Sequence, residues 1–271
     1  MLAICTSFDI KCSKALDHIT SDSTNEAGAN MHIKLITIGV SHYCEKARWA
    51  LDLAGLDFTE DAHAPIFHIP YVKSVGAGRT VPVLVAERVI GDSTEILKWI
   101  GAHPASTWDP YEHEAALEWE EKFDQIVGPH ARRLAYGWML PHKDLVMTMM
   151  HGKAKTWESR SLQVSYPLAA AGLRKSLNIT PDGVARSKAK LDAIFAEVAE
   201  VLDGRDYIVG EKLSAADLTF AALAAPLVLP KGYGWTMPVV EDLPDEIREE
   251  VEAYRNHPAG QFVMKTYDAH R

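Results

Sequence analysis

Residues 33–38, Ile-Lys-Leu-Ile-Thr-Ile, are mostly apolar and β-branched, and this pattern predicts a first β-strand. A helical spacing of apolar residues follows from Glu45 to Ala54. Further β-branched or weakly alternating runs predict strands at 57–61, 81–85 and 89–90, and helical spacing returns at 92–100. The prolines and glycines of residues 65–77 predict an irregular segment between them. The expected order is therefore β-α-β, an irregular stretch, then β-β-α.

Long helical periods replace the strand patterns after about residue 108. Asp109-Pro110 and Thr180-Pro181 each place an N-cap residue before a proline, which predicts two helix starts. We expect the first of these helices to be kinked, but not ended, at Gly128-Pro129. The segment 143–177 is helical in composition, and we expect a break around Tyr166-Pro167.

Leu213-Ser214-Ala215-Ala216-Asp217-Leu218 has the spacing of a capping box, in which the Ser214 and Asp217 side chains each bind the other's backbone amide. The residues that follow, 219–229, are almost entirely apolar. We expect a buried central helix, with a structural role for Asp217.

The length of 271 residues and the hydrophobic content of 47% predict two well-cored domains of ordinary size. The fold class expected is α+β, with a mixed four-stranded sheet and helices over residues 31–104 and an all-helical domain over 108–271. Residues 1–30 are polar and lack a secretory apolar core, so we interpret them as a loosely ordered appendage.

The net charge of −9 makes nucleic acid or an anionic membrane surface an unlikely partner on electrostatic grounds. No apolar run approaches the roughly 18 residues of a membrane-spanning helix. The three cysteines form no disulfide framework or Cys-x-x-Cys pair, which favours a reducing cytoplasm. The 12 histidines contain no paired metal-ligand motif, so no metal is expected.

Candidate chemistry lies where the first strand meets the first helix. Ser41 is placed to cap the helix, and Cys44 lies at its third position, where the helix dipole favours an anion. Either residue could instead be purely structural, Ser41 as a cap and Cys44 as a small core residue.

These motifs in this order resemble a cytosolic glutathione transferase, of a serine-type, bacterial-like kind. The resemblance is carried by Ser-x-x-Cys at the first junction, Val81-Pro82 before the third strand, Asp92-Ser93 at the next helix, and Tyr207 to Gly210 followed by the capping box. It covers residues 31–269 and implies a thioredoxin-like domain followed by the helical domain of this superfamily.

The resemblance implies that glutathione is the co-substrate and that the Ser41 hydroxyl activates its thiol. It also implies that Val81, before a cis proline at Pro82, binds the cysteinyl part as an added strand would. The helix start at Asp92-Ser93 would offer a hydroxyl and two free amides to the γ-glutamyl carboxylate, and Asp92 would bind the γ-glutamyl amine. Thr80 stands where a lysine is frequent, so Arg79 is the candidate cation for the glycine carboxylate. The structural alternative is that Asp92 and Ser93 only cap a helix and Pro82 only begins an edge strand.

The resemblance further implies a cytoplasmic homodimer that detoxifies small hydrophobic electrophiles. The electrophile pocket is expected between the domains, near Tyr111, Trp119, Arg132, Tyr136 and Trp138, with no role assigned to any one of them. His42 stands where many relatives have proline and could place a titratable group beside the sulfur. Two alternatives stay open, namely a glutathione-dependent thiol or ether-cleaving redox enzyme that uses Cys44, and a non-catalytic binding protein on the same fold.

Overall fold

A computed structural model describes residues 32–150 and 155–271 of the chain. The expected appendage, residues 1–30, lies outside the described residues. His32 to Arg271 forms one unit, and the arrangement below concerns that unit alone.

The sheet has four strands in the order β2-β1-β3-β4. Their bounds are Ile33–Ile38 for β1, Phe58–His63 for β2, Val83–Val85 for β3 and Val89–Ile90 for β4. The pairing is mixed, because β1 runs parallel to β2 but antiparallel to β3, and β3 runs antiparallel to β4. The mixed four-stranded sheet expected from the sequence is therefore confirmed.

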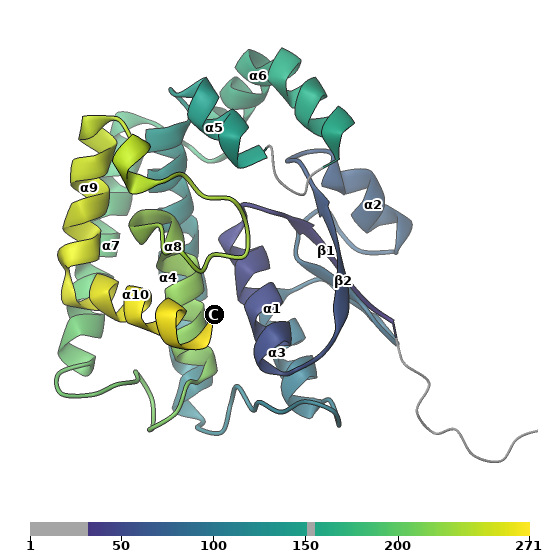
Figure 1. The fold of residues 1–271 in the computed structure, drawn as a ribbon, viewed down its shortest axis with the longest axis vertical. Coiled ribbons are helices and arrows are strands. Elements are labelled where there is room, and N and C mark those ends of the chain that lie inside the picture. Colours follow the sequence, from purple (N-terminus) through teal and green to yellow (C-terminus); the bar gives the residue numbers. More distant parts are fainter. Residues whose placement is uncertain (1–31, 151–154) are drawn as a thin grey trace, which may run out of the picture. The chain divides into compact units, whose positions relative to one another are not determined.

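Helices cover both faces of this sheet (Figure 1). Helices α1 (His42–Leu53) and α3 (Ser93–Ala102) contact each other and share a hydrophobic core with Leu35. The next residue of β1, Ile36, points to the opposite face and packs with Val72 of α2 (His68–Ser74).

The prediction of an irregular segment at 65–77 was wrong, because α2 occupies its middle. Pro70 lies in the first turn of α2, where its missing N–H would have had no partner in any case. Burial of Val72 between the sheet and its neighbours supplies the tertiary contact that this short helix needs.

The elements that follow α3 in the described part of the chain are all helical and lie beside the sheet and its helices in Figure 1. They are α4 (Ala115–Met139), α5 (Lys143–Met150), α6 (Thr156–Ser176), α7 (Pro181–Val201), α8 (Ala215–Val228), the 3₁₀ turn η1 (Val240–Asp242), α9 (Asp245–Asn256) and α10 (Pro258–His270). Every residue of α8 is buried, and α8 packs against α4, α10 and α1. The α+β fold and the central buried helix are both as the sequence indicated.

The capping box of α8 is present. One carboxylate oxygen of Asp217 accepts from the Ser214 amide at 2.9 Å, and the other accepts from the Ile208 amide at 2.7 Å. Thr180 likewise caps α7 as expected, because its hydroxyl accepts from the Gly183 amide at 3.0 Å.

The helix start expected at Asp109-Pro110 was wrong, since α4 begins at Ala115. Asp109 instead accepts from the Tyr111 amide in a turn, at 2.9 Å. The Pro110 carbonyl accepts from Ala215 in the first turn of α8 at 2.8 Å, so this segment is tied to another helix. Beyond its start, α4 continues through Pro129 as predicted.

The break expected around Tyr166-Pro167 was also wrong, because α6 continues from Thr156 to Ser176. Pro167 leaves the carbonyl of Gln163 without its helical partner. Both residues are exposed, so water can satisfy that carbonyl at little cost.

Polar contacts join α1 to α4 across the interior. The Lys46 ammonium is buried and lies 2.6 Å from a Glu120 carboxylate oxygen and 2.8 Å from one of Asp124. The Tyr43 hydroxyl donates to the Asp124 carbonyl at 2.9 Å. A Cβ at Gly128 would lie 1.9 Å from that hydroxyl, so only glycine permits this approach of the two helices.

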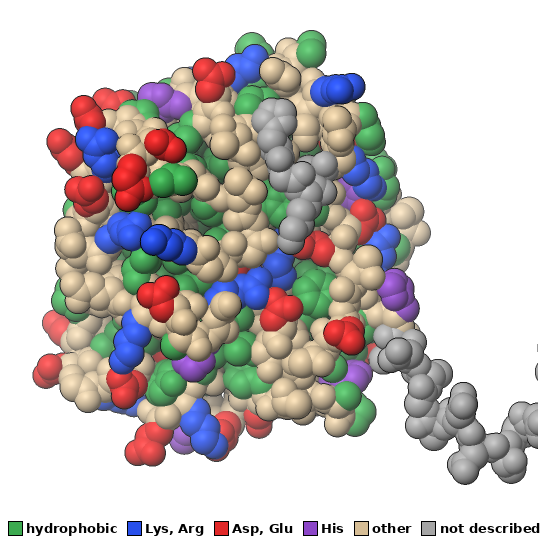
Figure 2. Space-filling model, viewed as in Figure 1, with side chains coloured by type: hydrophobic (Ala, Val, Ile, Leu, Met, Phe, Trp, Pro, Cys, Tyr) green, Lys and Arg blue, Asp and Glu red, His purple; other side chains and the backbone are tan. Residues whose placement is uncertain are grey.

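Charged side chains of both signs cover the face drawn in Figure 2, and acidic ones gather over α9. The exposed acidic residues there are Glu241, Asp242, Asp245, Glu246, Glu249 and Glu252. Within the described part of the chain, no helix has the length and apolar character needed to cross a membrane.

Candidate active site

Three strand ends meet at one edge of the sheet. Ile36 of β1 faces Val83, the first residue of β3, and Leu84 of β3 faces Ile90, the last residue of β4. The β1–β3 and β3–β4 pairs are antiparallel, so the chain leaves β1 and β4 and enters β3 at the same edge. The registers therefore bring together the segments that carry Ser41, Val81-Pro82 and Asp92-Ser93.

Ser41 follows β1 at this edge and occupies the N-cap position of α1 in an extended conformation. Its amide donates to the Ile38 carbonyl at 2.9 Å, and its own carbonyl accepts from Glu45 at 2.9 Å. The expected capping bond from its hydroxyl is wrong, because the side chain accepts from no first-turn amide. The half-buried hydroxyl therefore caps no amide of α1, and its side-chain partner is the Cys44 thiol.

Cys44 is completely buried one turn further along α1. Burial raises the pKa of its thiol to about 11, and hydrogen bonds with the Ile38 backbone and the Ser41 side chain oppose this rise only in part. The thiol is therefore protonated near neutral pH and shielded from solvent.

His42 is buried between α1 and α4, where its Nε2 donates to the Gly128 carbonyl at 3.0 Å. Burial, and next the positive charge of Arg132, lower its pKa to about 3. The imidazole is consequently neutral around pH 7. The expectation of a titratable group beside the sulfur is not met at that pH.

The Val81-Pro82 peptide bond is cis, as the resemblance implied. Val81 is half-buried, and among the described residues its N–H and C=O form no backbone hydrogen bond. Arg79 and Thr80 are exposed just before it. The Arg79 carbonyl accepts from His68 Nε2 at 3.0 Å, so the segment just before Val81 is held against α2.

Asp92 is the N-cap residue of α3, and one of its carboxylate oxygens accepts from the Thr94 and Glu95 amides at 2.9 and 3.1 Å. The expectation that these amides are free for a ligand is therefore wrong in part. Ser93, the first residue of the helix, is buried, and its own amide and hydroxyl form no hydrogen bond among the described residues. Ser93 thus keeps the groups with which a helix start can hold a carboxylate.

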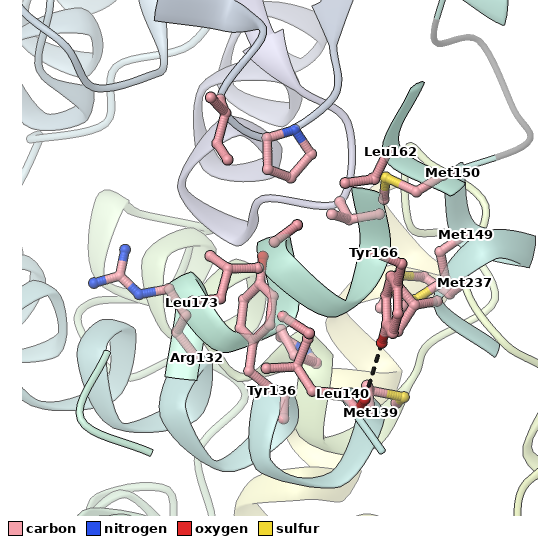
Figure 3. Close-up of a pocket in the computed structure, with 18 residues that line it drawn as sticks. Arg132, Tyr136, Met139, Leu140, Met149, Met150, Leu162, Tyr166, Leu173 and Met237 are labelled. Carbon is pink, nitrogen blue, oxygen red and sulfur yellow. Dashed lines mark hydrogen bonds between the residues drawn. The ribbon is translucent and has the colours of Figure 1, made fainter. Parts of the chain in front are cut away.

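An apolar cavity opens between this edge and the helices (Figure 3). Val40, the neighbour of Ser41, lines it, and so do Pro65 and Ile66 from the loop after β2. Its far wall contains Met139, Met149, Met150, Leu162, Tyr166 and Met237. The four methionines come from three parts of the chain, namely α4, α5 and the loop before η1, so no local signal in the sequence marks them as one surface.

Two of the five residues considered for this pocket line it, namely Arg132 and Tyr136 of α4. The other three belong to the packing of the helices. The Tyr111 hydroxyl donates to Glu120, the Trp119 ring lies 5.3 Å from that of Phe123, and the Trp138 ring lies 6.4 Å from that of Tyr254.

Ile66 has an unusual backbone conformation at the cavity wall, with φ of 79°. The Phe67 amide donates to the Ala64 carbonyl at 3.1 Å, so Pro65 and Ile66 are the central residues of a turn. Positive φ is costly for a β-branched side chain, and Ile66 gains little in return because it is 57% exposed.

We therefore expect Ile66→Gly to raise the free energy of unfolding by about 1 kcal/mol, since glycine adopts positive φ without strain. Urea denaturation followed by circular dichroism measures this change. Val164→Gly, at an exposed residue in the interior of α6, is the matched control and should lower stability by about 1 kcal/mol. Equal losses in both variants would contradict the strain assigned to Ile66.

Comparison with protein families gives two matches. The family described as "Glutathione S-transferase, N-terminal domain" matches residues 40–103, and "Glutathione S-transferase, C-terminal domain" matches residues 176–256. The chain belongs to the glutathione transferase superfamily. The first match contains Ser41, Val81 and Ser93, and the second contains the capping box of α8.

Solved structures with this transferase fold are similar along most of the chain. The β-etherase LigF from Sphingobium sp. strain SYK-6 is 20% identical with a TM-score of 0.56, and the match covers 87% of this chain and 100% of that one. A Ceriporiopsis subvermispora glutathione S-transferase in complex with glutathione is 16% identical, with a TM-score of 0.59 and coverage of 89% and 98%. Glutathione transferase GSTFuA3 from Phanerochaete chrysosporium is also 16% identical, with a TM-score of 0.60 and coverage of 89% and 97%.

At these identities the similarity defines the fold of this superfamily member and not its reaction. A comparison with curated proteins gave no significant match. Among residues 32–150 and 155–271, no group of three or more His, Cys, Asp or Glu side chains is arranged to hold a metal ion.

Proposed function

We propose that the protein is a glutathione transferase in which Ser41 activates the thiol of glutathione. The Ser41 hydroxyl would donate a hydrogen bond to the sulfur, which favours the thiolate and releases the thiol proton to solvent. The thiolate then attacks an electrophilic carbon, so that a C–S bond forms and the leaving group departs with its bonding electron pair. The observation that carries this proposal is the position of the Ser41 hydroxyl, which caps no helix amide, beside the wall of an apolar cavity.

Glutathione would lie along the sheet edge. In this proposal the unpaired N–H and C=O of Val81, which precedes Pro82, bind the cysteinyl backbone as a neighbouring strand would. Ser93 holds the γ-glutamyl carboxylate with its amide and hydroxyl, and the second carboxylate oxygen of Asp92 faces the amine. The exposed Arg79, next to Thr80, is the cation proposed for the glycine carboxylate.

The electrophile would occupy the cavity, whose apolar lining suits a small hydrophobic molecule. The similar fold of a β-etherase is compatible with an ether as the electrophile, in which case the C–O bond breaks and an aryloxide or alkoxide leaves. Such a reaction uses the thiolate of glutathione and needs no thiol of the protein. The burial and raised pKa of Cys44 disfavour the alternative in which this cysteine forms a disulfide with glutathione.

A cytoplasmic location, a homodimeric state and a role in detoxification complete the proposal. The first has support in the acidic composition and in three cysteines without a disulfide framework. The other two follow from membership of this superfamily.

Glutathione should bind saturably to the wild-type protein, and Ser93→Ala should weaken its binding about tenfold or more. A hydrogen bond to a charged carboxylate contributes about 1.5–3 kcal/mol, which corresponds to that loss. Calorimetric titration measures both affinities, with Ser165→Ala on the exposed face of α6 as the matched control.

The same proteins are then assayed for conjugation of glutathione with 1-chloro-2,4-dinitrobenzene, in which the C–S bond forms and chloride leaves. Formation of the thioether at a rate that added disulfides do not change supports transfer over redox chemistry. Absence of glutathione binding at millimolar concentration would eliminate both enzyme hypotheses and leave the binding-protein alternative.

A further inference from the structure

The cavity is apolar at one end and cationic at the other. Figure 3 shows Met149, Met150 and Met237 gathered at one end and Arg132 at the opposite end, with Tyr136 between them. Tyr166, the third side chain with a polar group, is already satisfied, because its hydroxyl donates to the Leu140 carbonyl at 2.9 Å. The groups that remain available to a ligand are therefore those of Arg132 and Tyr136.

Arg132 has no counter-ion in the part of the chain that the structure describes. No carboxylate lies within ion-pair distance of its guanidinium, and its Nε is buried without a hydrogen-bond partner. Its neighbour Arg133 differs, because Nε of that residue donates to the Leu177 carbonyl at 2.8 Å. A buried N–H without an acceptor is costly, so an acceptor bound at Nε would stabilise this side chain.

The groups around Arg132 offer no negative charge at neutral pH. Burial, and next the charge of Arg132, lower the pKa of His42. Burial raises the pKa of Tyr43 and of Tyr136, and the charge of Arg132 opposes that rise only in part. His42 is neutral there, and burial keeps both phenols protonated. The Tyr136 hydroxyl forms no hydrogen bond to another described residue, so it is a second donor on the same wall.

From this arrangement we infer that the cavity selects apolar molecules that carry a carboxylate, which Arg132 and Tyr136 bind while the methionine end receives the apolar part. The planar guanidinium matches a carboxylate with two parallel hydrogen bonds. Unbranched methionine side chains adapt to varied apolar shapes, so the charged end supplies the selectivity. The inference rests on the proposed function, because it takes the cavity as the electrophile site.

A binding measurement without glutathione tests the inference apart from catalysis. The probes are 4-phenylbutanoate and 4-phenylbutan-1-ol, which share the apolar part and differ in the charged group. Ligand-observed NMR titration gives both affinities for the full chain. We expect the wild type to prefer the carboxylate by about tenfold, which corresponds to one charge-assisted hydrogen bond of about 1.4 kcal/mol.

Arg132→Gln should remove this preference by weakening carboxylate binding about tenfold, with less than about a twofold change for the alcohol. Arg132→Lys should restore part of it, because the charge remains and the second parallel hydrogen bond is lost. Arg186→Gln, at an exposed arginine of α7, is the matched control and should behave as the wild type. Thermal unfolding of each variant verifies that it is folded.

Equal affinities of the wild type for the two probes would overturn the inference. So would a preference that Arg132→Gln leaves unchanged. A third contrary result is that Arg132→Gln weakens glutathione binding and not probe binding, since Arg132 would then belong to the glutathione site. Failure of the wild type to bind glutathione, with the probe preference intact, would instead reject the proposed function alone.

Discussion

Ser41→Ala is expected to lower kcat/KM for conjugation about 100-fold, which corresponds to about 2.7 kcal/mol of lost stabilisation of the thiolate. The Ser41 hydroxyl at the edge of the sheet, which caps no helix amide, is the group proposed to donate to the sulfur. Its removal disfavours the anion, so the pKa of the bound thiol rises toward that of free glutathione. At a given pH below that pKa, a smaller fraction of the bound glutathione is then thiolate. The pH profile of kcat/KM should therefore move to higher pH.

The pH dependence of kcat/KM, together with thiolate absorbance in the ultraviolet, measures this shift. Glutathione affinity should change little, because Val81 and Ser93 carry most of the binding in the proposal. Cys44→Ala should leave the rate within about twofold, since the buried thiol takes no part. The opposite result would be a folded Cys44→Ala variant without turnover and a Ser41→Ala variant as active as the wild type. It would assign the reaction to Cys44 and not to Ser41.

Lys46→Met is expected to lower the free energy of unfolding by about 3–5 kcal/mol. The substitution leaves the carboxylate of Glu120 buried without its cation, and Asp124 loses the same partner. An uncompensated charge in the interior costs this much because the surroundings cannot replace its solvation. The methionine itself fits the volume of the lysine stem, so packing loss contributes little.

Chemical denaturation at neutral pH measures the loss. The matched control is Lys98→Met, whose partner Glu95 lies 2.9 Å away on the surface of α3. That exposed ion pair contributes less than about 1 kcal/mol. A loss below 1 kcal/mol for Lys46→Met would contradict the stabilisation that is assigned to this buried ion-pair network.

The parts of the fold that were predictable depend on contacts close in sequence. A pattern of a few neighbouring residues predicts each of three elements, namely the strand at 33–38, the helix after it and the capping box of α8. Helix α2 was missed because Pro70 masks it and a tertiary contact of Val72 holds it. The start of α4 depends on the hydrogen bond between Pro110 and Ala215, which are far apart in sequence. The continuity of α6 depends on solvent at Gln163. Neither can be read from a local sequence pattern.

The candidate site shows the same division. Ser41, Val81 and Ser93 could be proposed because each lies at a junction that turn and cap residues mark in the sequence. Arg132 and the methionines of the cavity wall could not be singled out, since their proximity depends on how α4, α5 and the loop before α9 pack. Whether an arginine on a helix has a counter-ion is likewise a property of the folded chain alone.

The contacts of α1 with residues 270 and 271 have a consequence for biosynthesis. The Glu45 carboxylate accepts from Arg271 Nε at 3.0 Å, and the Trp49 indole donates to the His270 carbonyl at 2.8 Å. Glu45 and Arg271 are 226 positions apart, which a ribosome translates in about 10–45 s at 5–20 residues per second. During that interval the buried carboxylate lacks this cation. The tertiary contacts of α1 are therefore complete only after residue 271 has been added, and a shorter nascent chain lacks both the ion pair and the hydrogen bond that tie this helix to residues 270 and 271.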